Sequence, residues 1–261
     1  MPTTITVLTL LEMKKSGKPI AALTAYDFFT AKFLDKAGID LILVGDSIEM
    51  VLYGAKTTIT ANIDKIAFHT EAVAKGARHA MVVGDMPFLS YHCSIAETLK
   101  NAGRLMQAGA KAVKIEGGAK FADTVRAMVD SGIPVLGHLG MLPQSIHRIG
   151  GYIIHGEDEE SAEKLMDDAL ALEQAGVFAI VLEKVYHETA AKLTDFLKIP
   201  TIGIGSGVHC DGQILVVNDI LGLFDRFEPE FAKKYTDLKP MIIEAAKSYV
   251  DDVKDKKFPL K

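Results

Sequence analysis

The chain has 261 residues, of which 49% are hydrophobic and 24% are charged, and its formal net charge is −5. A chain of this length and apolar content is able to bury a large core in one domain. The acidic balance gives no basic surface for nucleic acid or an anionic membrane, so both are excluded as partners, whereas a small anionic substrate is not.

The N-terminal stretch MPTTITVLTLLEMKKSG is predicted to form a capped helix that ends near Gly17. It lacks the basic start and the small-residue cleavage site of a signal peptide, and no apolar run in the chain approaches the roughly 18 residues that span a bilayer. The two cysteines, Cys93 and Cys210, lie far apart and form neither a disulfide framework nor a zinc motif. We therefore expect a cytoplasmic protein.

Beyond this helix one pattern recurs five times: a helix-like segment ends at a glycine, and a short apolar run follows. Glycine is favoured just past a helix C-terminus because it adopts the left-handed conformation without a Cβ clash. The apolar runs, among them LILV, MVV and AIVL, are continuous, which is typical of strands covered on both faces. The five glycines are Gly38, Gly76, Gly109, Gly132 and Gly176.

Three further runs, IAALTAYD, IPTIGIGSG and GQILVVND, bring the number of predicted strands to about eight. With helical connections and a length close to the roughly 250 residues of such folds, the pattern predicts an α/β chain with the (β/α)8 TIM-barrel fold. We expect a single catalytic domain over residues 1–261, with the N-terminal helix and an extra C-terminal helix in PMIIEAAKSYVDDV. A doubly wound open sheet is the competing architecture.

The connections between the strands are of two kinds. Two of them have helical signals: TANIDKIAFHTEAVAKG with Thr60 or Asn62 as N-cap, and EDEESAEKLMDDALALEQAG with acids in its first turns. Two others, IEMVLYGAKTTIT and MLPQSIHRIGGYIIHG, are long and lack a clear helical pattern. Long loops after barrel strands usually form the mouth of the active site or a lid, and we expect the same of these.

Polar side chains collect at the C-terminal ends of the predicted strands, which is where TIM barrels carry their active sites. In KAVKIEGG, the alternation of a strand puts Lys114 and Glu116 on one face. The full set of polar residues at these ends is Asp27, Asp46, Ser47, Asp85, Lys114, Glu116, His138 and Glu183.

Three of these acids, Asp46, Asp85 and Glu116, come from consecutive strands and are expected to face one another across the mouth. Carboxylates that share a poorly solvated site repel one another unless a cation neutralises them. Carboxylate oxygens suit Mg²⁺, which keeps positions free for water and for substrate oxygens. The three acids therefore predict a magnesium site.

Structural roles remain open for the same residues. Asp46 and Ser47 would serve as an N-cap of the following helix, and Asp85, before Met-Pro, would serve as a turn former. Lys114 and Glu116 would form a private ion pair inside the barrel, although such pairs are weak stabilisers once desolvation is counted.

The predicted site suits enolisation of a 2-oxo acid. Mg²⁺ would polarise the ketone, while Lys114 and Ser47 would hold the carboxylate end of the substrate. Glu183, at the end of the sixth strand, approaches from the opposite side of the barrel and is the expected general base. His138 is interpreted as a hydrogen-bonded residue of the wall.

In their order along nearly the whole chain, the stretches TAYD, VGDS, ITANIDKIAFHTEAV, GDMPF, KAVKIEGG, GHLGMLPQS, VLEK and IGIGSGVHCDGQILVVND resemble the ketopantoate hydroxymethyltransferase family. The resemblance implies a (β/α)8 barrel enzyme of pantothenate biosynthesis that assembles as a homodecamer. It also implies transfer of a one-carbon unit from 5,10-methylenetetrahydrofolate to 3-methyl-2-oxobutanoate, which gives 2-dehydropantoate.

By the same resemblance, site residues are assigned one by one. Glu183 matches the proton acceptor of the family. The magnesium-binding acids are Asp46, Asp85 and Glu116, and the keto-acid contacts are Asp46, Ser47, Asp85 and Lys114.

The chain departs from the family pattern in both mouth loops. Glu49 and Tyr53 stand where a glycine-like and an aliphatic residue are expected, and the second loop is more basic than usual at His147, Arg148 and His155. These differences bear on folate contacts and on the lid more than on enolisation.

Two alternatives stay open. The first is an enzyme of the phosphoenolpyruvate mutase and isocitrate lyase type, but neither cysteine lies in the KKCGH-like loop that those enzymes carry. The second is a sensor of keto acids without catalysis, which would not need a base such as Glu183.

Overall fold

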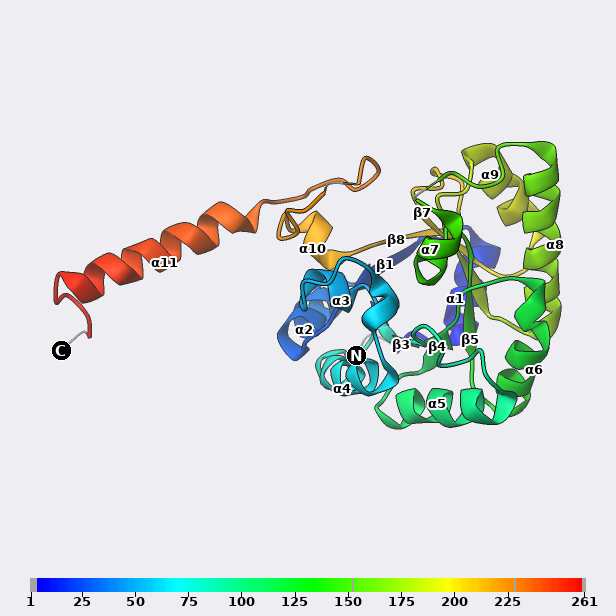
Figure 1. The fold of residues 1–261 in the computed structure, drawn as a ribbon, viewed down its shortest axis with the longest axis horizontal. Coiled ribbons are helices and arrows are strands. Elements are labelled where there is room, and N and C mark those ends of the chain that lie inside the picture. Colours follow the sequence, from blue (N-terminus) through cyan, green and yellow to red (C-terminus); the bar gives the residue numbers. More distant parts are fainter. Residues whose placement is uncertain (1–3, 152, 228, 260–261) are drawn as a thin grey trace. The chain divides into compact units, whose positions relative to one another are not determined.

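The computed structural model describes residues 4–151, 153–227 and 229–259, in which eight parallel strands close into a barrel (Figure 1). Each strand pairs in parallel with the next one along the chain, as in the register Asp85↔Lys114 between the third and the fourth. The predicted barrel is therefore confirmed, and an open doubly wound sheet is excluded. The strands are β1 Ile20–Thr24, β2 Leu41–Val44, β3 Met81–Asp85, β4 Ala112–Lys114, β5 Val135–Gly140, β6 Ala179–Glu183, β7 Thr201–Ile204 and β8 Gly212–Leu215.

Helices α2, α4, α5, α6, α8 and α9 lie around the outside of the barrel (Figure 1). None of the helices in the described ranges is both long and apolar enough to cross a membrane. Asn62, rather than Thr60, caps α4 by accepting a hydrogen bond from the Lys65 backbone N–H. The helices are α1 Val7–Ser16, α2 Phe28–Ala37, α3 Ile48–Val51, α4 Ile63–Gly76, α5 Ile95–Gln107, α6 Ala122–Asp130, α7 Ile146–Ile149, α8 Glu159–Ala175, α9 His187–Phe196, α10 Val217–Ile220 and α11 Leu238–Lys254, and the 3₁₀ turns are η1 Thr58–Thr60, η2 Ala119–Phe121 and η3 Pro143–Ser145.

The chain divides into two compact units, residues 1–214 and residues 215–261. The first unit contains the barrel and its surrounding helices. The second contains α10 and α11, and α11 is the helix predicted near the C-terminus, capped by Asp237. That the chain forms one catalytic domain over residues 1–261 stays a prediction.

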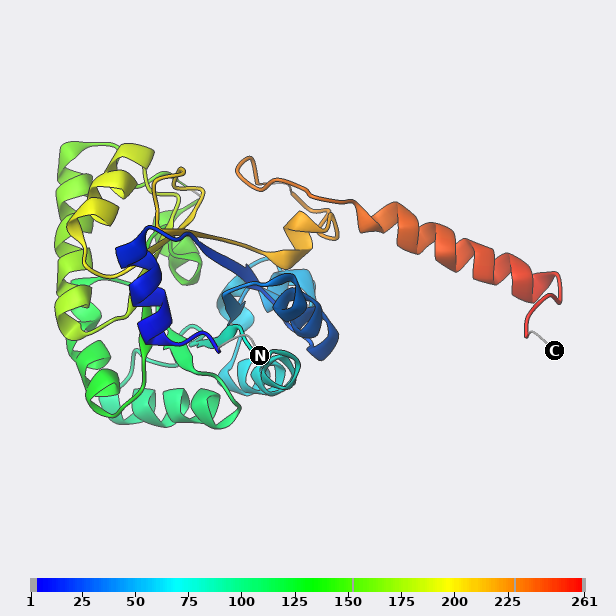
Figure 2. The same ribbon diagram turned by 180° about the vertical axis from the view of Figure 1, so that it is seen from behind.

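The interior of the barrel is filled with apolar side chains at the end where the strands begin. Helix α1 closes this end, and it contributes Leu10 and Met13 to the buried cluster (Figure 2). The helix is held there by Lys14, whose ammonium group donates to the Thr194 carbonyl and to Asp211 Oδ2, both at 2.8 Å. The strand residues of the cluster include Leu41, Leu43, Met81, Val83, Ala112, Leu136, Ala179, Val181 and Ile202.

Along each strand, the side chains that point into the barrel change from apolar at the beginning of the strand to polar at its end, where the mouth lies. Side chains two positions apart share a face of a strand. Asp85 therefore follows Val83 on the inward face of β3, and Glu183 follows Val181 on that of β6. The same residues that fill the barrel thus determine which polar side chains point into its mouth.

The predicted helix-end glycines behave in two ways. Gly38 and Gly176 adopt positive φ angles of 90° and 100° as C-caps, and Gly109 and Gly132 also have positive φ angles, as predicted. The prediction was wrong for Gly76, which is the last residue of α4 and has no positive φ. A Cβ atom there would lie 2.4 Å from the Phe28 carbonyl oxygen, so glycine is required because α4 packs closely on α2.

We predict that Gly76→Ala lowers the free energy of unfolding by about 1–3 kcal/mol, because a backbone oxygen cannot move aside for the added methyl group. Gly103→Ala is the matched control, since it lies inside α5 with no atom within 4 Å of the added Cβ. The control is expected to raise the stability by roughly 0.5–1 kcal/mol through helix propensity. Urea unfolding of both variants measures the difference, and equal effects would contradict this account of Gly76.

A second prediction concerns Asp35 on α2, whose Oδ1 accepts the backbone N–H groups of His79 and Ala80, each at 2.8 Å. Burial raises the pKa of this carboxyl, but the backbone donors outweigh burial and hold the pKa below its usual range. A lowered pKa stabilises the fold above the unfolded-state value of about 3.9, and this stability is lost as the pH falls through the folded value.

We therefore expect Asp35→Asn to destabilise the protein by roughly 1–3 kcal/mol at pH 7 and by progressively less below about pH 4. Denaturant unfolding of the parent and the variant between pH 7 and pH 3 provides the measurement. A difference that stays constant over this range would rule out the charge of Asp35 as the cause.

Candidate active site

Three buried acids meet at the mouth of the barrel. Asp46 follows β2, Asp85 ends β3 and Glu116 follows β4. The Asp46 backbone N–H donates to Asp85 Oδ2 at 3.1 Å, so the first two acids are direct neighbours. Burial and the adjacent Asp85 raise the pKa of the Asp46 carboxyl well above its usual range. Asp85 is thus a buried site residue rather than a turn former.

Lys114 lies among these acids. Its Nζ is 2.8 Å from Asp85 Oδ1 and 3.5 Å from Glu116 Oε1. Burial alone would lower the pKa of this ammonium group, but the surrounding carboxylates raise it above its usual value. Lys114 therefore stays charged and is shared between two acids, so it does not form a private ion pair with Glu116.

His138 links the acids to Glu183 on the other side of the mouth. Its Nε2 is 3.3 Å from Glu183 Oε2, and its Nδ1 is 3.5 Å from Glu116 Oε1. These contacts are at ion-pairing distance but lack hydrogen-bond geometry. Burial would lower the pKa of His138, yet the two carboxylates raise it to about 9. His138 is therefore an imidazolium at neutral pH and not merely a residue of the wall.

Ser47 contacts a residue that the sequence interpretation did not single out. Its Oγ is 2.8 Å from the hydroxyl of Tyr26, a buried residue just beyond β1. Ser47 precedes α3, but its side chain makes no capping hydrogen bond, so the capping role is excluded. The neighbouring Asp27 instead caps α2 by accepting from the Phe29 backbone N–H, and it makes no contact with the acids.

Ser206 fixes the end of β6, where Glu183 is carried. Its Oγ donates to the Leu182 carbonyl at 2.7 Å and accepts from the Val185 N–H at 2.9 Å. Lys184, between these two contacts, has a φ of 47°, a conformation that non-glycine residues rarely adopt. The turn that follows Glu183 is therefore held in an unfavourable backbone conformation by its neighbours, which is typical of functional sites.

Gln144 and Tyr91 join the acids from two further loops and were also missed by the sequence interpretation. Gln144 Nε2 donates to Asp46 Oδ2 at 3.0 Å, and the Gln144 backbone N–H donates to Glu116 Oε2 at 3.1 Å. The Tyr91 hydroxyl is 3.0 Å from Gln144 Oε1. For Gln144 the sequence offered one signal, its position in the long loop after β5. For Tyr91 it offered none, since this residue lies in no motif.

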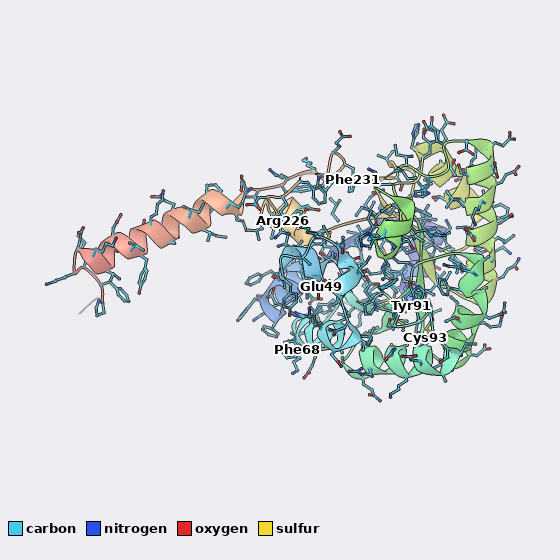
Figure 3. The ribbon with its side chains drawn as sticks, viewed as in Figure 1. Glu49, Phe68, Tyr91, Cys93, Arg226 and Phe231 are labelled. Atoms are coloured by element: carbon cyan, nitrogen blue, oxygen red, sulfur yellow. The ribbon has the colours of Figure 1, made fainter. Side chains whose placement is uncertain are left out.

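Glu49 and Tyr53, which are expected to depart from the family pattern, lie in the loop after β2 and contact α4. Glu49 on α3 is buried and accepts from Lys65 Nζ and Thr60 Oγ1, both at 2.8 Å (Figure 3). The Tyr53 hydroxyl is 2.9 Å from His69 Nε2. These contacts attach the loop after β2 to α4, through Lys65 and His69, and to the 3₁₀ turn η1, through Thr60. Their bearing on folate contacts stays a prediction.

The other basic departures lie in the loop after β5. His147 and Arg148 are exposed on α7. His155 donates its backbone N–H to the Lys184 carbonyl at 2.9 Å, beside the turn that follows Glu183. A role of these residues as a lid stays a prediction.

Carboxylates outnumber basic groups in the site. Four carboxylates face one ammonium and one imidazolium, which leaves an excess of two negative charges when all are ionised. Glu116 Oε1 is in addition buried without a hydrogen bond. The charged residues are Asp46, Asp85, Glu116, Glu183, Lys114 and His138.

Within the described parts of the chain, no group of three or more His, Cys, Asp and Glu side chains has an arrangement able to hold a metal ion. Mg²⁺ is usually held by one or two carboxylates, with waters and substrate oxygens in its other positions. The neighbouring pair Asp46 and Asp85 fits this chemistry, and Glu116 Oε1, which is buried without a hydrogen bond, offers a further oxygen. The set of three acids as magnesium ligands stays a prediction.

Comparison with known proteins identifies close relatives of the chain. A model of the ketopantoate hydroxymethyltransferase family matches residues 4–261. The 3-methyl-2-oxobutanoate hydroxymethyltransferase of Carboxydothermus hydrogenoformans is 50% identical over 256 residues, which cover 98% of this chain and 93% of the relative. The enzyme of that name from Chlorobium phaeobacteroides is 51% identical over 260 residues, 98% of this chain and 94% of the relative.

Solved structures share the fold at much lower identity. Phosphonopyruvate hydrolase, in complex with oxalate and Mg²⁺, has a TM-score of 0.64 and 12% identity over 96% of this chain and 87% of its own. A 2,3-dimethylmalate lyase of the PEP mutase/isocitrate lyase superfamily has a TM-score of 0.62 and 15% identity over 100% and 91%. These likenesses support the barrel fold alone.

The central position of Lys114 generates a prediction for stability. Lys114→Met leaves Asp85 and Glu116 buried without their ammonium partner, which costs about 3–5 kcal/mol of unfolding free energy at pH 7. Without Lys114 the pKa of these carboxyls rises in the folded state. Protonation as the pH falls then favours the fold, and the loss relative to the parent shrinks toward pH 4.

Lys164→Met is the matched control, because Lys164 pairs with Asp168 at 3.0 Å while its side chain is 75% exposed. This control is expected to change the stability by less than about 1 kcal/mol. Urea unfolding at pH 7 and pH 4 tests both variants. A pH-independent loss in Lys114→Met would show that lost packing, and not charge, is responsible.

Proposed function

The chain belongs to the ketopantoate hydroxymethyltransferase family of transferase enzymes, and from this membership we propose that it converts 3-methyl-2-oxobutanoate into 2-dehydropantoate. The donor is 5,10-methylenetetrahydrofolate, which supplies the one-carbon unit, and water supplies the oxygen of the new hydroxymethyl group. The observation that carries the proposal is the buried cluster of Asp46, Asp85, Lys114 and Glu116, with Glu183 reached through His138.

The anionic end of the keto acid binds to donors at the mouth. The Lys114 ammonium group provides a charge-assisted hydrogen bond to a carboxylate, and the Ser47 hydroxyl provides a second donor. Tyr26, 2.8 Å from Ser47 Oγ, orients that hydroxyl. Asp46 and Asp85 complete the contacts to the keto acid.

The excess negative charge of the site and the raised pKa of Asp46 support a role for a divalent cation. Asp46, Asp85 and Glu116 would hold Mg²⁺, which when bound supplies Lewis-acid stabilisation for the enolate of the substrate. When no Mg²⁺ is bound, the Lys114 ammonium group neutralises part of the negative charge of the acids, because it lies 2.8 Å from Asp85.

Glu183 removes the proton from C3 of the keto acid. Its carboxylate is 14% exposed, whereas the other acids of the site are almost completely buried, so Glu183 is accessible to substrate. The His138 imidazolium, 3.3 Å away, orients the carboxylate toward the mouth. Loss of the proton makes C3 nucleophilic. Addition of water to the methylene carbon of the folate breaks its two C–N bonds, so that tetrahydrofolate leaves and the one-carbon unit remains at the oxidation level of formaldehyde. C3 adds to this carbon, and the oxygen that came from water takes up a proton to become the new hydroxyl group.

The setting of the reaction is part of the proposal. The product is an intermediate of pantothenate biosynthesis, and the two free cysteines, Cys93 and Cys210, suit the reducing cytoplasm. Self-association as a homodecamer is part of the proposal by family membership. Taken by itself, α11 has no buried residue and carries several apolar side chains that need a partner surface. These include Met241, Ile242, Ile243, Tyr249, Val250 and Val253.

Proton exchange in D₂O tests the proposal at its first step. We expect the parent protein with Mg²⁺ and 3-methyl-2-oxobutanoate, without folate, to replace the C3 proton by deuterium, as followed by NMR. Glu183→Gln is expected to slow this exchange about 10²–10⁴-fold, because it removes the general base. Glu188→Gln, an exposed residue on α9, is the matched control and should leave the rate unchanged.

A chelator is expected to abolish the exchange, and fresh Mg²⁺ to restore it. The absence of exchange in the parent protein would refute the proposed enolisation and favour a sensor of keto acids. Exchange that yields no 2-dehydropantoate after addition of 5,10-methylenetetrahydrofolate would point to another electrophile.

A further inference from the structure

Gln144 uses its backbone N–H and both ends of its side-chain amide inside the site. It lies in the 3₁₀ turn η3 after β5 and is only 3% exposed. Its backbone N–H donates to Glu116 Oε2 at 3.1 Å. Its side-chain Nε2 donates to Asp46 Oδ2 and to the Met86 carbonyl, both at 3.0 Å, and its Oε1 lies 3.0 Å from the Tyr91 hydroxyl.

These contacts permit only one orientation of the Gln144 amide. Nε2 faces a carboxylate and a carbonyl oxygen, which accept hydrogen bonds but do not donate them. A flipped amide would place Oε1 against both oxygens and would leave the Tyr91 hydroxyl facing an NH₂ group. Tyr91 in turn is buried, and its hydroxyl accepts the Glu116 backbone N–H at 3.1 Å. The hydroxyl has two acceptors for its proton, Gln144 Oε1 at 3.0 Å and the Glu116 carbonyl at 3.1 Å, so contacts on all sides restrict its position.

Gln144 therefore holds one oxygen of each of two acids. It engages Oδ2 of Asp46 and Oε2 of Glu116, while Glu116 Oε1 is buried without a hydrogen bond. In this way the loops after β2, β4 and β5 are joined, and Met86 and Tyr91 add the loop after β3.

The choice of an amide has an electrostatic consequence. A lysine or arginine at this position would also bind the two acids, but its charge would neutralise them and oppose a second cation. An amide donates hydrogen bonds without a net charge, so it holds the two carboxyl groups without opposing a second cation. Partners behind metal ligands usually orient the ligands in this manner.

We propose that Gln144 is a positioning residue that presets Asp46 and Glu116 for a divalent cation, and that Tyr91 fixes the Gln144 amide for this task. The inference rests on the magnesium-dependent function proposed above. It concerns binding of the cation before any substrate is present, so it is tested separately from the reaction.

The test measures the affinity of the full-length protein for Mn²⁺, as a stand-in for Mg²⁺, by calorimetric titration without substrate. Gln144→Met keeps the size of the side chain and removes its hydrogen bonds, and we expect it to bind Mn²⁺ about 10–100-fold more weakly. Tyr91→Phe removes only the hydroxyl and is expected to weaken binding about 2–10-fold.

A double variant separates positioning from general destabilisation. If Tyr91 acts through Gln144, adding Tyr91→Phe to Gln144→Met will weaken Mn²⁺ binding no further. Asn101→Leu is the matched control, because its largely buried amide donates to the Ser90 carbonyl at 2.8 Å and touches none of the acids. It is expected to lower the melting temperature but to leave Mn²⁺ affinity within twofold of the parent.

Affinity within twofold of the parent in Gln144→Met would overturn the proposal. If that variant does not fold, Tyr91→Phe decides alone, and an unchanged affinity in it overturns the proposal as well. A parent protein that binds Mn²⁺ but does not exchange the C3 proton would refute the proposed function, while weakened binding in the variants would still support the role of Gln144.

Discussion

The contact between the Lys114 ammonium group and the Asp85 carboxylate, at 2.8 Å, allows a cluster of acids to exist inside this barrel. Buried carboxylates are costly unless they are paired, and the same cation also lies 3.5 Å from Glu116. One lysine and the His138 imidazolium do not neutralise four carboxylates, however. Burial and the adjacent Asp85 raise the pKa of Asp46 well above its usual range, as is expected where buried carboxylates outnumber the cations that face them.

The barrel supplies this cluster through the simple geometry of its strands. Inward-facing residues are apolar where the strands begin, and they are replaced by Asp85, Lys114, His138 and Glu183 where the strands end. Helix α1 closes the apolar end. The apolar residues that stabilise the barrel and the polar residues of the site therefore lie at opposite ends of the same strands. Solved barrels with only 12–15% identity share the fold.

The acids are held in place by neutral partners rather than by further charges. Gln144 binds one oxygen each of Asp46 and Glu116, and Ser206 holds the turn that follows Glu183. Lys184 keeps a positive φ in that turn. Such contacts restrict the orientation of a carboxylate without reducing its charge.

The sequence by itself determined the strands, most of the helix-end glycines and the positions of Asp46, Asp85, Lys114, Glu116 and Glu183, because each follows from a local pattern of period two or from a helix end. Only the tertiary structure decided what those residues touch. Gln144 meets Asp46 across 98 positions of the chain, and Gly76 is required by the Phe28 carbonyl of another helix. The sharing of Lys114 between two acids was also decided by the fold. A local sequence pattern indicates which face of a strand a side chain occupies. The contacts of that side chain depend on loops that are distant in sequence and that the closed barrel brings together.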